Sequence, residues 1–163
     1  MREWIFAIVV GAIIVAILVY RGLQLEKVGE LLVPSTMMGM KLRLTVRRET
    51  VSVDHARVHA GISASGGTGL KSLTDQEALQ VAHWLEEACT RSDTSFGIAG
   101  GIEIASSYDG RDYRVEVLQH SGEGVGATLT ADQARTVAGW LRLAAAPGRT
   151  LADARRRSRK APA

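Results

Sequence analysis

Between residues 41 and 145 the apolar positions follow two periods, and the whole pattern occurs twice. Residues 73–88, LTDQEALQVAHWLEEA, and residues 129–144, LTADQARTVAGWLRLA, carry apolar side chains at steps of three and four, which predicts two amphipathic helices. The threonine before each run has Glu77 or Gln133 three residues later, the spacing of a capping box. We therefore expect both helices to begin in the same way.

The buried stripes of the two predicted helices correspond position by position. Trp84 and Trp140 flank these stripes at equivalent places, and we interpret both as packing anchors. The stripes consist of Ala78, Val81, Ala82, Leu85, Ala88 and Cys89 in the first copy, and of Ala134, Val137, Ala138, Leu141, Ala144 and Ala145 in the second.

A hairpin with alternating apolar positions precedes each helix. In the second copy the alternation continues on both sides of Asp109-Gly110, which favours a two-residue turn. In that register Ile104 faces Val115, Ile102 faces Val117 and Ser106 faces Tyr113, all on a buried side. In the first copy the inward positions are Leu42, Leu44 and Val46 on one strand and Val58, Ala60 and Ile62 on the other.

The fold class predicted is α+β, with a duplicated β-β-α unit over 41–145. One hairpin with one helix cannot bury its apolar face, whereas two units side by side form a four-stranded antiparallel sheet with two helices on one face. We place repeat one at 41–91 and repeat two at 97–145, joined by SDTSFGIAG. The alternative is an intertwined dimer in which each half pairs with its counterpart in another chain.

The first 33 residues predict a transmembrane anchor and a juxtamembrane helix. Residues 4–20, WIFAIVVGAIIVAILVY, carry no charge, and their eleven Ile, Val, Leu and Phe residues favour the bilayer by about 3 to 7 kcal/mol. Leu25, Val28 and Leu32 form one stripe that continues the helix until Pro34, and 34–40 is a hinge. A cleaved signal peptide is the alternative, but the apolar run is long and no small-residue cleavage site follows it.

The positive charges around this segment indicate its orientation. Arg2 precedes the segment, whereas Arg21, Lys27 and Lys41 follow it, so the positive-inside rule places the C-terminal body in the cytoplasm. We expect a single-pass protein of the plasma membrane.

The basicity of the chain is concentrated in its last 18 residues. Residues 146–163 carry six basic side chains against Asp153, a net of +5, and because the whole chain of 163 residues carries +3 the remainder carries −2. We expect a disordered basic tail that contacts anionic lipid; the alternatives are contact with nucleic-acid phosphates and a tail that only keeps the chain soluble. Its candidate contact residues are Arg155, Arg156, Arg157, Arg159 and Lys160.

The outward positions of the predicted sheet give a candidate interaction surface of two unlike halves. One interpretation is that the halves neutralise each other across the sheet, and the other is that they recognise a partner or another copy of the chain. The first half displays Lys41, Arg43, Arg47, Arg57 and His59, and the second displays Glu103, Asp112, Arg114 and Glu116.

Patterns that indicate catalysis or cofactor binding are weak in this chain. The glycine-rich run SASGGTGLKS, residues 63–72, has Leu70 where a phosphate-binding loop needs glycine, so we interpret it as a strand-to-helix connection. The four histidines do not have metal-ligand spacing, and the single cysteine, Cys89, falls within a packed helix. We expect no enzyme activity, no cofactor and no metal.

These features favour a membrane-anchored, non-enzymatic interaction module that organises a protein partner or copies of itself. The alternatives are a membrane-tethered nucleic-acid-binding protein and a phage membrane protein that acts in lysis or exclusion. The absence of asparagine and the sixteen arginines among twenty basic residues indicate a bacterial or phage origin.

Overall fold

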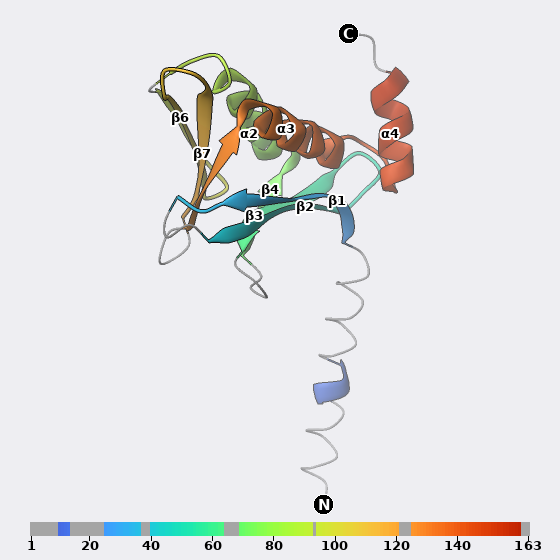
Figure 1. Ribbon diagram of the computed structural model, residues 1–163. Coiled ribbons are helices and arrows are strands. Elements are labelled where there is room, and N and C mark those ends of the chain that lie inside the picture. Colours follow the sequence, from blue (N-terminus) through green and yellow to red (C-terminus); the bar gives the residue numbers. More distant parts are fainter. Residues whose placement is uncertain are drawn as a thin grey trace, which may run out of the picture.

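The computed structural model describes residues 10–13, 25–36, 40–63, 69–92, 94–120 and 125–160. Four strands followed by one helix occur twice, and a further helix follows the second copy (Figure 1). The first copy contains β1 (Glu26–Pro34), β2 (Lys41–Thr50), β3 (Ala56–Ser63), β4 (Leu70–Thr74) and α2 (Asp75–Glu87). The second contains β5 (Thr94–Ala99), β6 (Ile102–Tyr108), β7 (Tyr113–Gln119), β8 (Val125–Thr130) and α3 (Ala131–Ala145), and α4 (Leu151–Lys160) ends the described chain.

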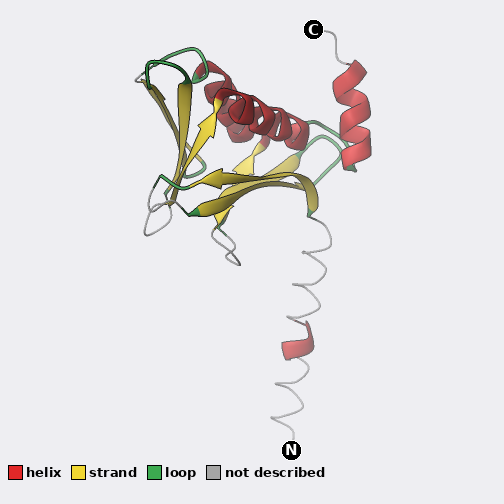
Figure 2. Ribbon diagram, in the orientation of Figure 1, coloured by secondary structure: helices red, strands yellow, loops and turns green. Residues whose placement is uncertain are grey.

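The α+β class and the internal duplication are confirmed, but the repeat unit is ββββα rather than ββα. Each copy builds its own antiparallel sheet, in the orders β1-β2-β3-β4 and β5-β6-β7-β8, so the prediction of one shared four-stranded sheet was wrong. The two sheets stand at a steep angle, and α2 and α3 lie in the angle between them (Figure 2). Each helix contacts strands of both copies, so neither repeat packs separately.

The segment predicted as a juxtamembrane helix and a hinge is strand β1 with the connection that follows it. Residues 26–34 pair antiparallel with β2, with Leu31 opposite Leu44 and Val33 opposite Leu42. Val33 is buried, and the pairing satisfies the backbone of a β2 edge that a helix would leave open. The long-range partner therefore overrides the local helical stripe.

The two sheets are joined where β1 ends. Ser35 forms a bridge with Ala127 of β8, and the Thr36 backbone N–H donates to the Gly126 carbonyl at 3.1 Å. A second link comes from the buried Gln119, whose Oε1 accepts from the Ile62 N–H at 2.8 Å and whose Nε2 donates to the Gly69 carbonyl. The amide of one repeat thus satisfies backbone groups of the other.

The β6–β7 hairpin has a longer turn than the sequence predicts. Tyr108 pairs with Tyr113, so four residues form the turn, and Ile104 pairs with Val117 instead of Val115. The register differs by two positions, and because side chains alternate with a period of two, the same residues stay on the buried face. Ile102, Ile104, Ser106, Val115 and Val117 are all buried.

One hydrophobic core serves both repeats. The inward residues of β2, β3, β6 and β7 and the predicted stripes of α2 and α3 belong to a single buried cluster. The two capping boxes are confirmed: the Glu77 N–H donates to Thr74 Oγ1 at 3.2 Å, and the Gln133 N–H donates to Thr130 Oγ1 at 3.3 Å. Both helices therefore begin in the predicted way.

Each tryptophan covers the first strand of the other repeat. A Cβ atom placed on Gly29 of β1 would overlap the indole of Trp140, and one placed on Gly97 of β5 would lie 3.3 Å from Cη2 of Trp84. Both glycines follow a bulge, at Lys27/Gly29 and at Ser95/Gly97. Each repeat thus packs its tryptophan on the first strand of the other, and both edge strands are packed against the shared core.

The predicted anchor over residues 4–20 lies outside the described residues except for a helical stretch at 10–13. Among the helices that the structure describes, none has the length and apolar character needed to span a bilayer.

Candidate interaction surfaces

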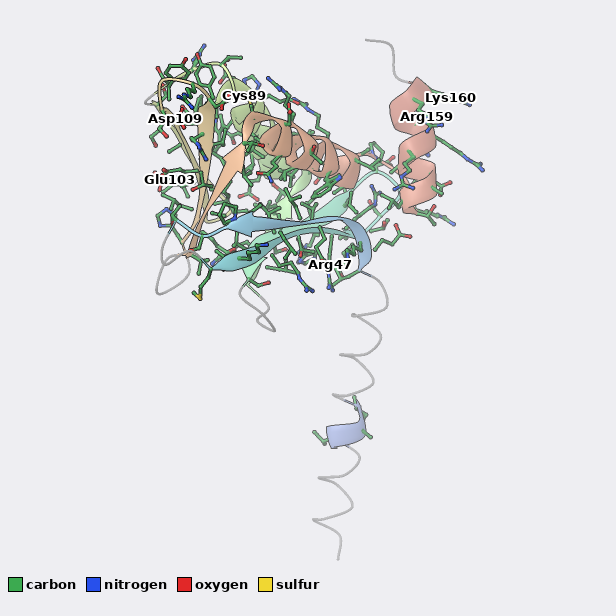
Figure 3. All side chains as sticks on the ribbon, viewed as in Figure 1. Arg47, Cys89, Glu103, Asp109, Arg159 and Lys160 are labelled. Atoms are coloured by element: carbon green, nitrogen blue, oxygen red, sulfur yellow. The ribbon has the colours of Figure 1, made fainter. Side chains whose placement is uncertain are left out.

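The outer face of the first sheet carries the predicted basic residues. Lys41, Arg43 and Arg47 alternate outward along β2, and Arg57 and His59 do so on β3, while their neighbours in sequence point to the core. Lys27 of β1 lies beside Arg47 in the register and joins the same set. We call this surface the basic face, with the members Lys27, Lys41, Arg43, Arg47, Arg57 and His59; Figure 3 labels Arg47 on it.

Two carboxylates neutralise part of the basic face. Glu30 Oε2 lies 2.6 Å from Lys27 Nζ, and its Oε1 lies 3.3 Å from Arg43 Nε. The hydrogen bond from Lys27, together with the charge of Arg43, holds the pKa of Glu30 below its usual value. Glu49 pairs with His59 at 3.0 Å.

Three cations of the basic face, Lys41, Arg47 and Arg57, have no ion-pair partner among the described residues. The Nε of Arg47 is also buried without a hydrogen-bond acceptor in the described part of the chain. Buried donors are normally satisfied, so this N–H is an exception among the described residues.

The outer face of the second sheet is the site of the predicted acidic residues. Glu103 and Glu116 point outward with Arg114, whereas Asp112 lies in the β6–β7 turn and not on the sheet. His120 Nε2 lies 2.7 Å from Glu103 Oε2. We call Glu103, Arg114 and Glu116 the acidic face.

The two faces belong to different sheets, which stand at a steep angle to each other (Figure 2). The ion pairs of the described residues of these faces stay within one repeat, as in Arg43–Glu30 and His120–Glu103. The interpretation that the halves neutralise each other across one sheet was therefore wrong, because the fold turns them in different directions.

The turn between β6 and β7 is organised by Asp109. Its Oδ1 accepts the backbone N–H groups of Asp112 at 2.9 Å and Arg111 at 3.0 Å, and its Oδ2 accepts from Arg114 Nε at 3.1 Å. These backbone donors, followed by Arg114, lower the pKa of the Asp109 carboxyl. The aspartate side chain thus closes a four-residue turn and holds Arg114 toward the turn end of the sheet.

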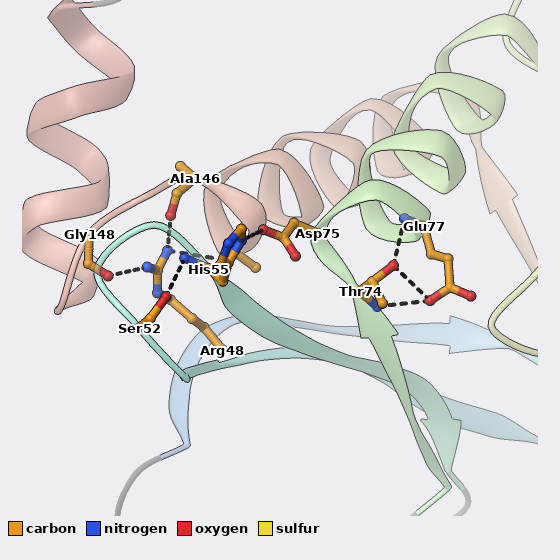
Figure 4. Close-up of polar contacts among 9 residues, drawn as sticks. Arg48, Ser52, His55, Thr74, Asp75, Glu77, Ala146 and Gly148 are labelled. Atoms are coloured by element: carbon orange, nitrogen blue, oxygen red, sulfur yellow. Dashed lines mark hydrogen bonds and ion pairs between the residues drawn. The ribbon is translucent and has the colours of Figure 1, made fainter.

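A buried arginine that sequence reasoning missed fixes the end of α3. Arg48 points inward from β2 and is 1% exposed. Its Nη1 donates to the carbonyls of Ala144 at 3.1 Å and Ala146 at 2.5 Å, and its Nη2 donates to Gly148 at 2.5 Å (Figure 4). The consecutive arginines at 47 and 48 carry the signal, since one of two neighbours on a strand must face the core.

The described part of the basic tail is largely helical where the sequence predicted disorder. Residues 151–160 form α4, and its candidate contact residues are all helical. The Asp153 N–H donates to Thr150 Oγ1 at 3.2 Å, so Thr150 caps this helix much as Thr74 and Thr130 cap the others. The threonine-to-aspartate spacing is a signal that was available in the sequence.

The residues weighed for metal and nucleophile chemistry lie apart from one another. In the described ranges no three His, Cys, Asp or Glu side chains gather as a metal site. Cys89 is buried, with its thiol 3.1 Å from the Leu85 carbonyl, and burial raises its pKa. Of the glycine-rich run, residues 69–72 enter strand β4 instead of connecting directly to a helix, and 64–68 lie outside the described residues.

Comparison of the chain with protein-family models, with curated proteins and with solved structures found no match. The functional argument therefore depends on the surfaces themselves.

Proposed function

We propose that the chain is a membrane-anchored, non-enzymatic interaction module whose copies associate head to tail. In this proposal the basic face of one copy contacts the acidic face of the next. Opposite faces that meet in this way form a heterologous contact, which generates rings or open filaments.

The placement of the two faces on separate sheets is the observation that carries the proposal. No ion pair among the described residues joins the two faces, and Lys41, Arg47 and Arg57 have no carboxylate partner there. Glu116 likewise forms no ion pair among them. Pairing between copies would bring these two sets of opposite charge together.

The membrane anchor in the proposal comes from the apolar run at 4–20. Glu26, the first residue of β1, follows Tyr20 by six positions, a reach of at most about 20 Å. An anchor there would hold the basic face near the bilayer and raise the effective concentration of neighbouring copies.

A charge-swap experiment tests the association. Sedimentation velocity of the full chain in neutral nanodiscs at low salt should show assemblies that fall apart at high salt. Arg47→Glu and Glu116→Arg should each abolish assembly, and mixing the two variants should restore it, because both contacts between unlike copies then join opposite charges.

The control is Arg135→Glu, which makes the same charge change on α3 and should assemble like the unaltered chain. Assembly that survives both swaps, or a mixture that stays monomeric, would contradict head-to-tail association through these faces.

A further inference from the structure

Helix α4 is held in place by contacts from its first turn and from the segment before it. The Gly148 N–H donates to the Val53 carbonyl at 2.9 Å, and the Leu151 N–H donates to Glu26 Oε2 at 2.5 Å. Ala154 is fully buried. The basic side chains of α4 therefore project from a helix whose backbone is held against the rest of the protein.

An open hollow of about 450 Å³ lies between α4 and the β2–β3 loop. Arg156, Arg157 and Lys160 lie three, four and seven positions after Asp153, which places all four residues on one side of α4. Arg149 and Val53 complete the lining, whereas Arg155 and Arg159 of the same helix are absent from it.

The lining carries an excess of positive charge that the described residues do not neutralise. Four cations, Arg149, Arg156, Arg157 and Lys160, face a single carboxylate. None of the four forms an ion pair within the described residues. Like charges held together without partners repel one another, and a bound anion would remove that repulsion.

We propose that this hollow binds a phosphate group that carries at least two negative charges. Guanidinium groups match phosphate oxygens through paired N–H donors, and the lysine adds a further point charge. The lining has no aromatic side chain on which a nucleobase would stack, so it favours a compact phosphate over a nucleic-acid strand. A soluble polyphosphate and the phosphomonoester headgroup of a lipid share this chemistry.

Paired variants of equal charge provide the test. Pyrophosphate is titrated by calorimetry into the full chain, held in nanodiscs of neutral lipid at physiological ionic strength. Arg156→Gln/Arg157→Gln should weaken binding by about tenfold or more, since it removes two charged donors from the hollow. Arg155→Gln/Arg159→Gln removes the same charge from the same helix outside the hollow and should change the affinity by less than about twofold.

Equal losses in the two double variants would overturn the site, because they would show a diffuse attraction to a basic helix. Binding of a single-stranded oligonucleotide with no binding of pyrophosphate would also overturn it, in favour of a nucleic-acid surface. Circular dichroism of each variant checks that α4 is retained, since glutamine is a good helix former.

A second arm identifies the source of the phosphate. Phosphatidic acid in the nanodisc should weaken apparent pyrophosphate binding, relative to phosphatidylserine at matched surface charge, if lipid headgroups occupy the hollow. Equal affinities in the two lipids would assign the site to a soluble phosphate. Both results sustain the site, and neither depends on head-to-tail association, which the Arg47 and Glu116 variants test separately.

Discussion

At the scale of single residues, the charge of Arg48 is balanced mainly by backbone carbonyls. Desolvation lowers the pKa of its guanidinium, while Glu26, Asp153 and Asp75 act in the opposite direction from a distance. The carbonyls it binds belong to the last turn of α3 and the segment after it, where the helix dipole concentrates negative potential. One side chain of repeat one thus orders the C-terminal end of repeat two.

Replacing Arg48 should therefore lower the stability of the protein and at the same time weaken the attachment of α4. We expect Arg48→Met to lower the free energy of unfolding by about 2 to 4 kcal/mol, because several buried carbonyls lose a charged donor. Arg48→Lys should recover part of this, since an ammonium reaches fewer acceptors than the guanidinium fork. Urea unfolding measures both effects.

Arg43→Met on the exposed side of the same strand is the control and should change stability by less than about 0.5 kcal/mol. Equal effects at positions 43 and 48 would show that the carbonyl contacts do not stabilise the fold.

A second residue-scale prediction concerns the pH dependence of the Glu86–Arg142 pair, which joins α2 to α3. Arg142 Nε and Nη2 lie 3.0 and 2.5 Å from the two Glu86 carboxylate oxygens. The hydrogen bond lowers the pKa of Glu86 and raises that of Arg142. Because the folded-state pKa of the carboxyl is depressed, its contribution is present above the unfolded-state value and is lost as the pH falls through the folded-state value.

A double-mutant cycle with Glu86→Gln and Arg142→Met should give a coupling free energy below about 1 kcal/mol near neutral pH, since both side chains are partly exposed. The coupling should decrease as the pH falls through the lowered folded-state pKa of Glu86 and should vanish below it. A coupling that grows on acidification would have the wrong sign for an ion pair and would contradict the assignment.

At the scale of elements, α2, α3 and the strands β2, β3, β6 and β7 could be predicted because their signals are local. The capping boxes are complete within four residues, and the inward alternation of Leu42 and Leu44 or Ile102 and Ile104 is visible without knowing the partner strand. The basic face followed from the same alternation, since residues 41, 43 and 47 lie on the opposite side of β2 from those apolar residues.

The four missed strands, β1, β4, β5 and β8, depend on partners that the local sequence does not reveal. β1 carries a stripe compatible with a helix, and β4 and β5 contain few apolar residues or are broken by glycine. Their pairing with β2, β3, β6 and β7 decides their conformation. The hollow beside α4 was missed for a related reason, because it exists only where Val53 of a distant loop meets that helix.

The bulge glycines give a prediction at the same scale. Gly29→Ala should destabilise the protein by about 1 to 3 kcal/mol, because the new methyl group overlaps the Trp140 indole and forces the ring away from β1. Gly139→Ala, on the neighbouring residue of α3, meets no atom within 4 Å and should be neutral or stabilising by up to about 1 kcal/mol. Thermal unfolding with Trp fluorescence compares the two directly.

The double variant Gly29→Ala/Trp140→Leu tests whether contact with the indole causes the destabilisation. A smaller side chain at 140 relieves the overlap, so the alanine should cost less in this background than alone. An unchanged cost would mean that the strand backbone, and not the ring contact, requires glycine at position 29.

At the scale of the whole molecule, the two repeats form one folding unit. The buried cluster extends through both sheets, the tryptophans are exchanged between repeats, and Arg48 and Gln119 satisfy backbone groups across the boundary in opposite directions. A repeat without its counterpart would expose the inner face of its sheet and one side of its helix to water. Apolar exposure of that extent is incompatible with an independently stable domain of about 65 residues.

Separating the repeats tests whether they form one folding unit. Fragments 25–92 and 94–160 should each lack a cooperative thermal transition when purified alone, because each loses the strands and the helix that cover its apolar surface. Mixed in equal amounts, they should regain the circular dichroism spectrum and the cooperative melting of the joined chain, since the shared core depends on contacts and not on the linking peptide. A fragment that melts cooperatively by itself with native helix content would show that the duplication joined two complete domains, and the reciprocal packing of Trp84 and Trp140 would then be an interface instead of a core.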